Sequence, residues 1–480
     1  MAVLVTNTDS AVNDLRSPGR LEVVRLGTSG NTIYSFVAAN GLLYQKSIDQ
    51  GATWAAGIDV LATNTGNQWF DLFYEKWLGP SGPNRDIVHC VAFHDAGSRG
   101  MYYNQLDIST DTLGTEVRAV PTSGGAPDSH FNAFGMSLSG NLYACAHGFI
   151  GTVSRRSSDD GVTWLSAANV MEIVDDYCVM YPDASSADPD DMLGLYWDES
   201  ASQLSVKQYD WSANSFVETA IATITDTPTG GGRNWGSAFS YVDGVVYVAS
   251  LDLDGTGSNT LSFWKVDGGT VTAMTSPVTS TSFMRCVSVD CDETGINVYY
   301  GIDKAAVSLD SLQIYRKRSV DGGATWGAEQ LYSTRDSDIV VINAPSFTDG
   351  YHAPTYGEFA ANDKYIEAPG FASGDPYQPF DTGAMPRQLW TVRKYPNFGF
   401  VVAPRFAPFP PPGEPIPDGA SSIPARAPAS LVRPPLNTGF VTSSRPAPIP
   451  PPIPPFAPPA RRRLEIDTNP SDTIDLDPTV

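Results

Sequence analysis

The stretch Ser47-Ile-Asp49-Gln-Gly51-Ala-Thr53-Trp54 returns in the same pattern twice more along this 480-residue chain. The other copies are Ser157-Ser-Asp159-Asp-Gly161-Val-Thr163-Trp164 and Ser319-Val-Asp321-Gly-Gly323-Ala-Thr325-Trp326, so all read Ser-x-Asp-x-Gly-x-Thr-Trp. In a tight turn an Asp side chain accepts backbone N–H bonds two residues on, and Gly supplies a positive φ. Thr favours the outgoing strand, and Trp offers a large apolar surface to a neighbouring unit. Each copy therefore predicts a β-hairpin turn.

The repeated pattern resembles the Asp-box, or BNR repeat, of the sialidase-like β-propellers. The resemblance implies an all-β ring of four-stranded blades. It implies a fold rather than an activity, because Asp-boxes also occur in non-catalytic propellers.

Periodic apolar segments support a repeated architecture. Strand-like runs recur about every 50 residues, as expected for propeller blades; they are 32–37, 86–91, 141–146, 192–197, 245–250, 296–300 and a weaker copy at 363–367. We count seven blades, beginning near residues 21, 67, 130, 176, 233, 283 and 339, with six as the alternative if the long second unit is partly insertion. We expect closure by pairing Met1–Thr6 or Leu21–Leu26 with Gln388–Arg393, which would leave no open sheet edge.

Composition fits an extended all-β chain and excludes several partners. Hydrophobic residues make up 41% of the chain and charged residues 17%, with 43 Gly and 38 Pro. The net charge of −23 indicates that neither nucleic acid nor an anionic membrane is a partner, since both are bound through basic patches. The N-terminus lacks the basic region of a signal peptide. We expect synthesis in a cytoplasm, followed by work outside the cell or in a virion.

The five cysteines are odd in number and lie mostly in apolar runs, which favours buried thiols over a disulfide framework. The five histidines are scattered and form no recognisable metal set. We therefore predict no metal and no cofactor.

Proline dominates the chain beyond residue 396. Residues 397–480 hold 22 of the 38 prolines, and their seven arginines balance seven acids. This composition predicts a propeller at 1–396 and an extended, polyproline II-rich tail at 397–480.

The tail carries an internal repeat with an offset of 40 residues. Segments 397–412 and 437–452 both read Asn-x-Gly-Phe-Val-x-x-x-Arg-x-Ala-Pro-x-Pro-Pro-Pro. Duplication of a plain linker explains this pattern, and so do two equivalent docking segments on other copies of the protein. In the docking interpretation the contacts come from Gly399, Phe400, Val401, Arg405, Gly439, Phe440, Val441 and Arg445.

The sequence matches the catalytic motifs of the sialidase family poorly. The resemblance implies an arginine triad, a Tyr–Glu nucleophile pair and an acid/base Asp ahead of the first Asp-box. The nearest match to the expected Arg-Ile-Pro is Leu15-Arg16-Ser-Pro18, and no Asp lies between Arg16 and the first box. Tyr356 and Glu358 form a conceivable nucleophile pair. We lean against an enzyme and assign no catalytic residue.

Binding has better support. Aromatic and polar residues recur at blade starts, where a propeller faces its central channel; as a ligand face we name Trp69, His130, Tyr181, Arg233, Trp235 and Arg285. The alternative for each is packing between blades.

Three functional hypotheses follow. The first is a homo-oligomeric structural subunit of a virion or extracellular filament, whose tail docks on neighbouring copies and whose propeller face recognises surface glycans. The second is a free glycan-binding propeller. The third is a sialidase-type glycoside hydrolase.

Overall fold

The computed structural model describes parts of the chain between Ala2 and Ala372. The described residues are 2–5, 22–27, 30–38, 42–49, 51, 53–61, 70–94, 100–121, 132–148, 151–166, 178–198, 203–223, 235–253, 259–280, 282, 284–304, 312–337, 339–348, 351–352, 354–358, 363–366 and 371–372. The chain divides into two units, Met1–Pro396 and Asn397–Val480, and every described residue belongs to the first. The residues predicted to dock from the tail, Gly399 to Arg445, lie outside the described residues.

Within the described residues, six sheets are each formed by one continuous stretch of chain, and their strands are antiparallel. The first three contain β2 (Glu22–Gly27), β3 (Gly30–Ala38), β4 (Leu42–Ser47) and β5 (Ile58–Leu61); β6 (Phe70–Tyr74), β7 (Ile87–His94), β8 (Gly100–Asp107), β9 (Thr112–Leu113) and β10 (Val117–Pro121); and β11 (Asn132–Met136), β12 (Leu142–Gly148), β13 (Gly151–Ser157) and β14 (Leu165–Ser166). A 3₁₀ segment, η2 (Glu75–Ser81), is inserted between β6 and β7.

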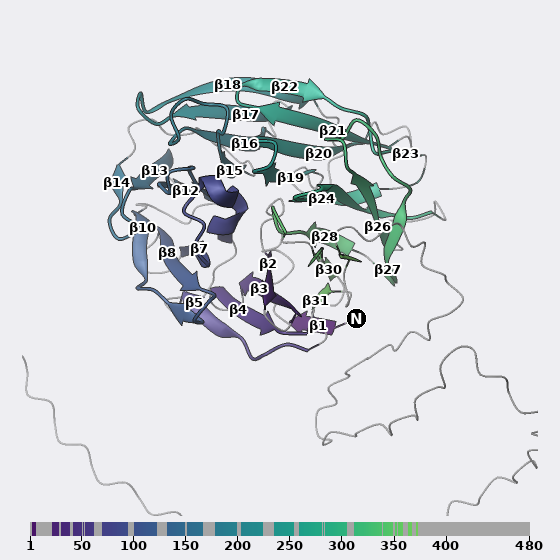
Figure 1. The fold of residues 1–480 in the computed structure, drawn as a ribbon, viewed down its shortest axis with the longest axis horizontal. Helices are drawn as coiled ribbons and strands as arrows, with labels where there is room; N and C mark the ends of the chain where they lie inside the picture. Colours follow the sequence, from purple (N-terminus) through teal and green to yellow (C-terminus); the bar gives the residue numbers. More distant parts are fainter. Residues whose placement is uncertain are drawn as a thin grey trace, which may run out of the picture. The chain divides into compact units, whose positions relative to one another are not determined.

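The next three sheets repeat this order. They contain β15 (Cys178–Pro182), β16 (Met192–Asp198), β17 (Gln203–Asp210) and β18 (Ser215–Thr223); β19 (Trp235–Ser240), β20 (Val245–Leu253), β21 (Asn259–Asp267), β22 (Thr270–Ala273) and β23 (Val278–Ser280); and β24 (Met284–Asp292), β25 (Gly295–Ile302), β26 (Leu312–Ser319) and β27 (Gln330–Ser337). Figure 1 shows the sheets around a ring, with first strands toward the centre and fourth strands at the rim.

One further sheet joins the two ends of the described chain. Its order is β1 (Ala2–Val5), β31 (Asp363–Ile366), β30 (Thr355–Glu358) and β28 (Ile339–Asn343), and Ala2 lies opposite Ile366. The N-terminal strand therefore does pair with a late strand, within the expected segment Met1–Thr6. Its partner is β31; the expected partner Gln388–Arg393 lies outside the described residues. Two short strands, β29 (Tyr351–His352) and β32 (Phe371–Ala372), pair with each other.

The expected count of seven blades is wrong, and the alternative count of six fits the described residues. Six blades are continuous, whereas the unit expected near residue 339 is a composite sheet. It takes its outermost strand from the N-terminus, so it is not a seventh copy of the same four-strand segment. The weak repeat at 363–367 also falls on a third strand rather than on a second.

The core lies between adjacent sheets. Neighbouring first strands approach so closely that glycine is required: a Cβ at Gly135 would lie 2.7 Å from Met180, and one at Gly236 would lie 2.8 Å from the Cα of Ser288. Side chains on both faces of these strands are buried because each sheet is sandwiched between two others.

The antiparallel order gives the ring two distinct faces. All first strands begin at one face, which we call the strand-start face. The turns from first to second strand, and from third to fourth strand, lie at the other, the turn face. The three Ser-x-Asp-x-Gly-x-Thr-Trp turns follow β4, β13 and β26 and therefore belong to the turn face.

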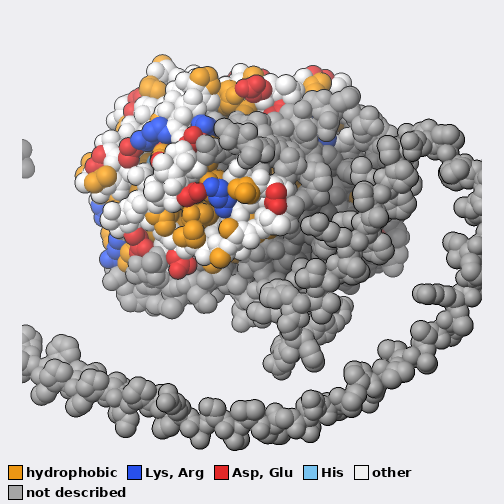
Figure 2. All heavy atoms as spheres, turned by 60° about the horizontal axis from the view of Figure 1, so that its bottom comes forward, with side chains coloured by type: hydrophobic (Ala, Val, Ile, Leu, Met, Phe, Trp, Pro, Cys, Tyr) orange, Lys and Arg blue, Asp and Glu red, His pale blue; other side chains and the backbone are white. Residues whose placement is uncertain are grey.

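Charged side chains are dispersed over the part of the surface that Figure 2 displays. Acidic and basic groups alternate there with apolar ones instead of gathering in one patch. Within the described residues no helix has the length and apolarity needed to cross a membrane.

Candidate functional site

The three repeat turns share one hydrogen-bond scheme. In the second copy the Gly161 N–H donates to Ser157 Oγ at 2.9 Å, and the Thr163 N–H and hydroxyl donate to Asp159 at 2.8 and 2.6 Å. The copies at Asp49 and Asp321 repeat these bonds. The backbone partner lies four residues after the Asp rather than the expected two. These bonds also lower the pKa of Asp159.

Two of the repeat turns pack on an aromatic ring of the preceding sheet. Trp164 meets Tyr103 of β8 edge-on, with ring centroids 5.4 Å apart, and Trp326 meets Phe263 of β21 at 4.9 Å. Gly161 and Gly323 lie under the same two rings, and a Cβ at Gly161 would come within 2.1 Å of Tyr103. These turns therefore join adjacent blades, as expected for Trp.

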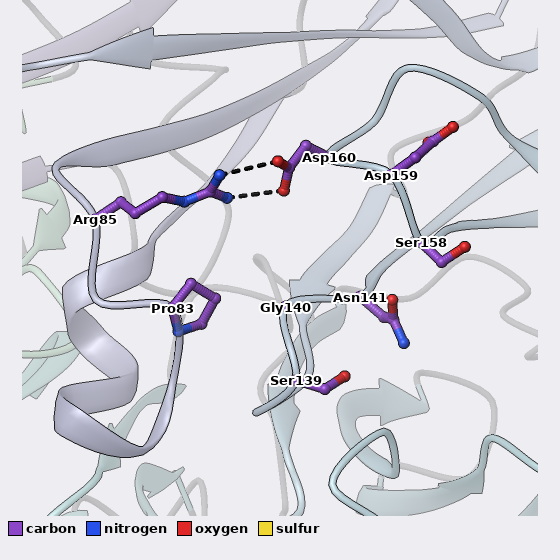
Figure 3. Close-up of a pocket in the computed structure, with 8 residues that line it drawn as sticks. All are labelled: Pro83, Arg85, Ser139, Gly140, Asn141, Ser158, Asp159 and Asp160. Atoms are coloured by element: carbon purple, nitrogen blue, oxygen red, sulfur yellow. Dashed lines mark hydrogen bonds and ion pairs between the residues drawn. The ribbon is translucent and has the colours of Figure 1, made fainter.

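A polar pocket opens on the turn face beside the second repeat turn. It has a volume of about 350 Å³, and its lining is Pro83, Arg85, Ser139, Gly140, Asn141, Ser158, Asp159 and Asp160. Figure 3 shows the Arg85 side chain reaching across to Asp160, while the Asp159 carboxylate points away from it. The two Arg85–Asp160 hydrogen bonds measure 2.9 and 2.7 Å.

Behind the pocket lies a partly buried network, which we call the Arg85 network. Arg85 also donates to Glu75, with an Nε–Oε2 distance of 2.8 Å. The buried Glu75 contacts Nε2 of His89 at 2.9 Å, and Nδ1 of His89 contacts the Tyr103 hydroxyl at 2.7 Å. The Tyr103 hydroxyl also lies 3.0 Å from the Asp160 carbonyl oxygen. The network thus joins η2, β7, β8 and the second repeat turn.

Charge pairing sets the protonation of these groups. Burial opposes ionisation of Glu75, but hydrogen bonds from His89 and Arg85 outweigh it and lower the pKa of the carboxyl. The Arg85 guanidinium lowers the pKa of Asp160, and its own pKa is raised by Asp160 and Glu75. Arg85 is thus ion-paired with two carboxylates, those of Glu75 and Asp160. The arrangement connects two blades and offers no activated nucleophile or acid/base pair.

The structure describes three of the six residues expected to form the ligand face. Trp69, His130 and Arg233 lie outside the described residues. Tyr181 is fully buried and its hydroxyl donates to the Ser237 carbonyl at 3.0 Å, while Trp235 is 2% exposed. Both side chains therefore pack between blades, the alternative that the sequence left open, because each lies in a first strand covered by both neighbours.

Arg285 is half-buried near the start of β24, at the strand-start face. The β24–β25 register shifts between Arg285 and Val287, and Cys286 between them has a φ of +60°. A positive φ at a non-glycine residue is uncommon, and bulges of this kind re-aim side chains near functional sites.

Neither the cysteines nor a metal-binding cluster contributes to the candidate site in the described residues. All five cysteines are buried free thiols, as expected, and burial raises the pKa of Cys145 to about 12. Over the described ranges, no group of three His, Cys, Asp or Glu side chains is arranged to hold a metal ion.

Only one feature of the sequence points to the Arg85 network. The second repeat turn alone carries Asp at its variable fourth position, where the other copies have Gln50 and Gly322. That carboxylate, Asp160, is the one that Arg85 binds.

Sheet order and ring closure define the class of protein: a β-propeller. No protein-family model matches the chain, and no curated protein matches its sequence. The solved structures similar to this chain are distant in sequence. One is a PL25 ulvan lyase, a polysaccharide lyase, with 9% identity and a TM-score of 0.48 over 78% of this chain and 96% of that one.

Two sialidase-type structures are also similar. The intramolecular trans-sialidase of Ruminococcus gnavus has 12% identity and a TM-score of 0.36 over 78% of this chain and 97% of that one. The NanB sialidase of Streptococcus pneumoniae has 8% identity and a TM-score of 0.36 over 77% and 70%. These proteins act on glycans.

Proposed function

We propose that this chain is a non-catalytic assembly subunit of a virion or extracellular filament, whose proline-rich tail docks on neighbouring copies. The tail repeat carries the proposal. Segments 397–412 and 437–452 agree at ten positions, including Phe400 and Phe440, although proline-rich spacers need no such agreement. As polyproline II, the 40-residue offset spans on the order of 120 Å, enough to reach separate subunits.

The turn face supports a structural role. The groups of the Arg85 network there, Glu75, Arg85, His89 and Asp160, bind one another and join two blades. The shared hydrogen bonds of the three repeat turns support assigning them to the Asp-box repeat, a packing element. The sequence also lacks the acid/base Asp of the sialidases. Hydrolysis of a fluorogenic sialoside above the rate in buffer would refute the non-catalytic assignment.

Assembly is tested by light scattering on the full chain. Replacing both Phe400 and Phe440 with Ala should reduce the oligomers to monomers, since both docking anchors are lost. The matched control replaces Phe406 and Phe409, which the second tail segment does not share, and should leave the mass unchanged. If both double variants keep the wild-type mass, the tail is only a tether.

Glycan recognition at the strand-start face is the second candidate. The observation that favours it is the bulge with a positive φ at Cys286, directly beside Arg285 at that face. On a glycan array the full chain should bind, and Arg285→Ala should lose binding while its circular dichroism stays unchanged. Equal binding by the variant would remove Arg285 from the site.

A further inference from the structure

The outermost strand β18 differs from the other blade edges. It runs for nine residues, Ser215–Thr223, and pairs with β17 on its inner side. In the part of the chain that the structure describes, no strand pairs with its outer side. Figure 1 shows β18 along the rim of the ring, where β22 follows it while pairing with β21.

Other blade edges carry features that discourage strand addition. Proteins protect exposed edges with short strands, bulges, charges and proline. Here β14 has only two residues and β22 only four. β5 and β1 each have four residues and one register shift, and β27 has two register shifts. The edge strand β10 combines a register shift with Arg118 and Pro121.

β18 lacks this protection over its first six residues. Its pairing with β17 is regular from Ser215 to Ala220, and the sequence Ser-Phe-Val-Glu-Thr-Ala has one charge and no proline. Val217 is 64% exposed, and Glu218 and Ala220 are exposed beside it. An open edge of this kind favours pairing with another extended segment.

We propose that β18 is the receptor for the tail: Gly399–Val401 or Gly439–Val441 of another copy adds to its outer edge as a short strand. This inference rests on the proposed assembly function and names its receptor surface. Backbone hydrogen bonds supply the affinity of strand addition, and side chains such as Val217 supply the specificity.

The tail segments suit this edge in sequence. Each lies in a proline-free window, residues 397–403 and 437–445, where a β-branched and aromatic run can pair without losing N–H donors. Each repeat segment carries one charge, Arg405 or Arg445. The β17–β18 hairpin, residues 203–223, has one Lys and two acids and so a net charge of −1. The net charges are opposite in sign, while the Glu218 carboxylate itself is paired with Lys207 and Tyr196.

Light scattering on the full chain with Val217→Lys tests the receptor. The lysine should weaken self-association by about tenfold or more, because it removes a cross-strand apolar contact and adds a charge at the edge. The control is Val320→Lys, since Val320 is 75% exposed on a repeat turn and away from β18. This control should assemble like wild type.

The outcomes separate the two proposals. If the Phe400/Phe440 double variant is monomeric while Val217→Lys assembles normally, the tail docks elsewhere: the receptor inference fails and the assembly function stands. If the wild-type chain is itself monomeric, the assembly function fails and the receptor inference falls with it.

Cross-linking gives a second readout. Because all five native cysteines are buried, Val217→Cys and Val401→Cys on separate copies would be the reactive thiols in a mixture. We expect a disulfide-linked dimer under mild oxidation. The control pair, Val320→Cys with Val401→Cys, should give none. Equal yields from the two mixtures would overturn the inference.

Discussion

Replacing Gly161 with Ala tests whether the repeat turns join the blades. Gly161 has a φ of +81°, and a Cβ there would lie 2.1 Å from the Tyr103 ring. The left-handed backbone costs a non-glycine residue about 1–2 kcal/mol. Overpacking adds about 1–3 kcal/mol. Together these estimates predict a loss of about 2–5 kcal/mol in unfolding free energy, since Tyr103 cannot move without disturbing His89 and Asp160.

The assay is urea denaturation followed by tryptophan fluorescence. Gly244→Ala is the matched control, because Gly244 has a φ of +68° but its Cβ would meet only Ala184, at 3.3 Å. It should lose about 1–2 kcal/mol, the backbone cost alone. Equal losses in the two variants would show that contact between the turn and Tyr103 contributes no stability.

Three further predictions concern the described body. Arg85→Met should lower the unfolding free energy by about 1–3 kcal/mol, because it removes one of the two charged partners of the buried Glu75 carboxylate and leaves only His89; a loss near zero in urea denaturation would show that the ion pair is not net stabilising. The pKa of Asp160 in the folded protein lies below its ordinary value of 3.8. The ion pair with Arg85 therefore stabilises the fold at pH values above 3.8, and this stabilisation is lost as the pH falls through the folded-state pKa. Asp160→Asn should therefore flatten acid denaturation followed by circular dichroism between about pH 5 and 2, and an unchanged slope would contradict the pairing. Ellman's reagent should find none of the five thiols in the native protein and all five in denaturant, whereas rapid labelling of the native chain would contradict their burial.

Much of the fold could be predicted from sequence because its signals are local. Apolar runs bounded by Gly- and Asp-rich turns placed blade starts near residues 233 and 283, and β19 and β24 begin at Trp235 and Met284. The composite sheet was harder, because strand pairing between residue 2 and residue 366 depends on ring closure rather than on any local pattern.

The candidate site could be predicted less well. Glu75 and His89 are 14 residues apart and meet because β6 pairs with β7, which places Phe73 opposite His89. No periodicity marks η2, which begins at Glu75 and contains Pro80 and a non-helical Gly79. Aromatic residues at blade starts also have two interpretations. Tyr181 packs between blades because of the direction of its side chain within the strand, which composition cannot reveal.

The central claim is that the tail makes this propeller an assembly subunit. Its most direct test is the light-scattering mass, with negative-stain images, of the full chain beside a 1–396 truncation. The account predicts oligomers or fibres from the full chain and a propeller-sized monomer from the truncation. Monomers from both would contradict it.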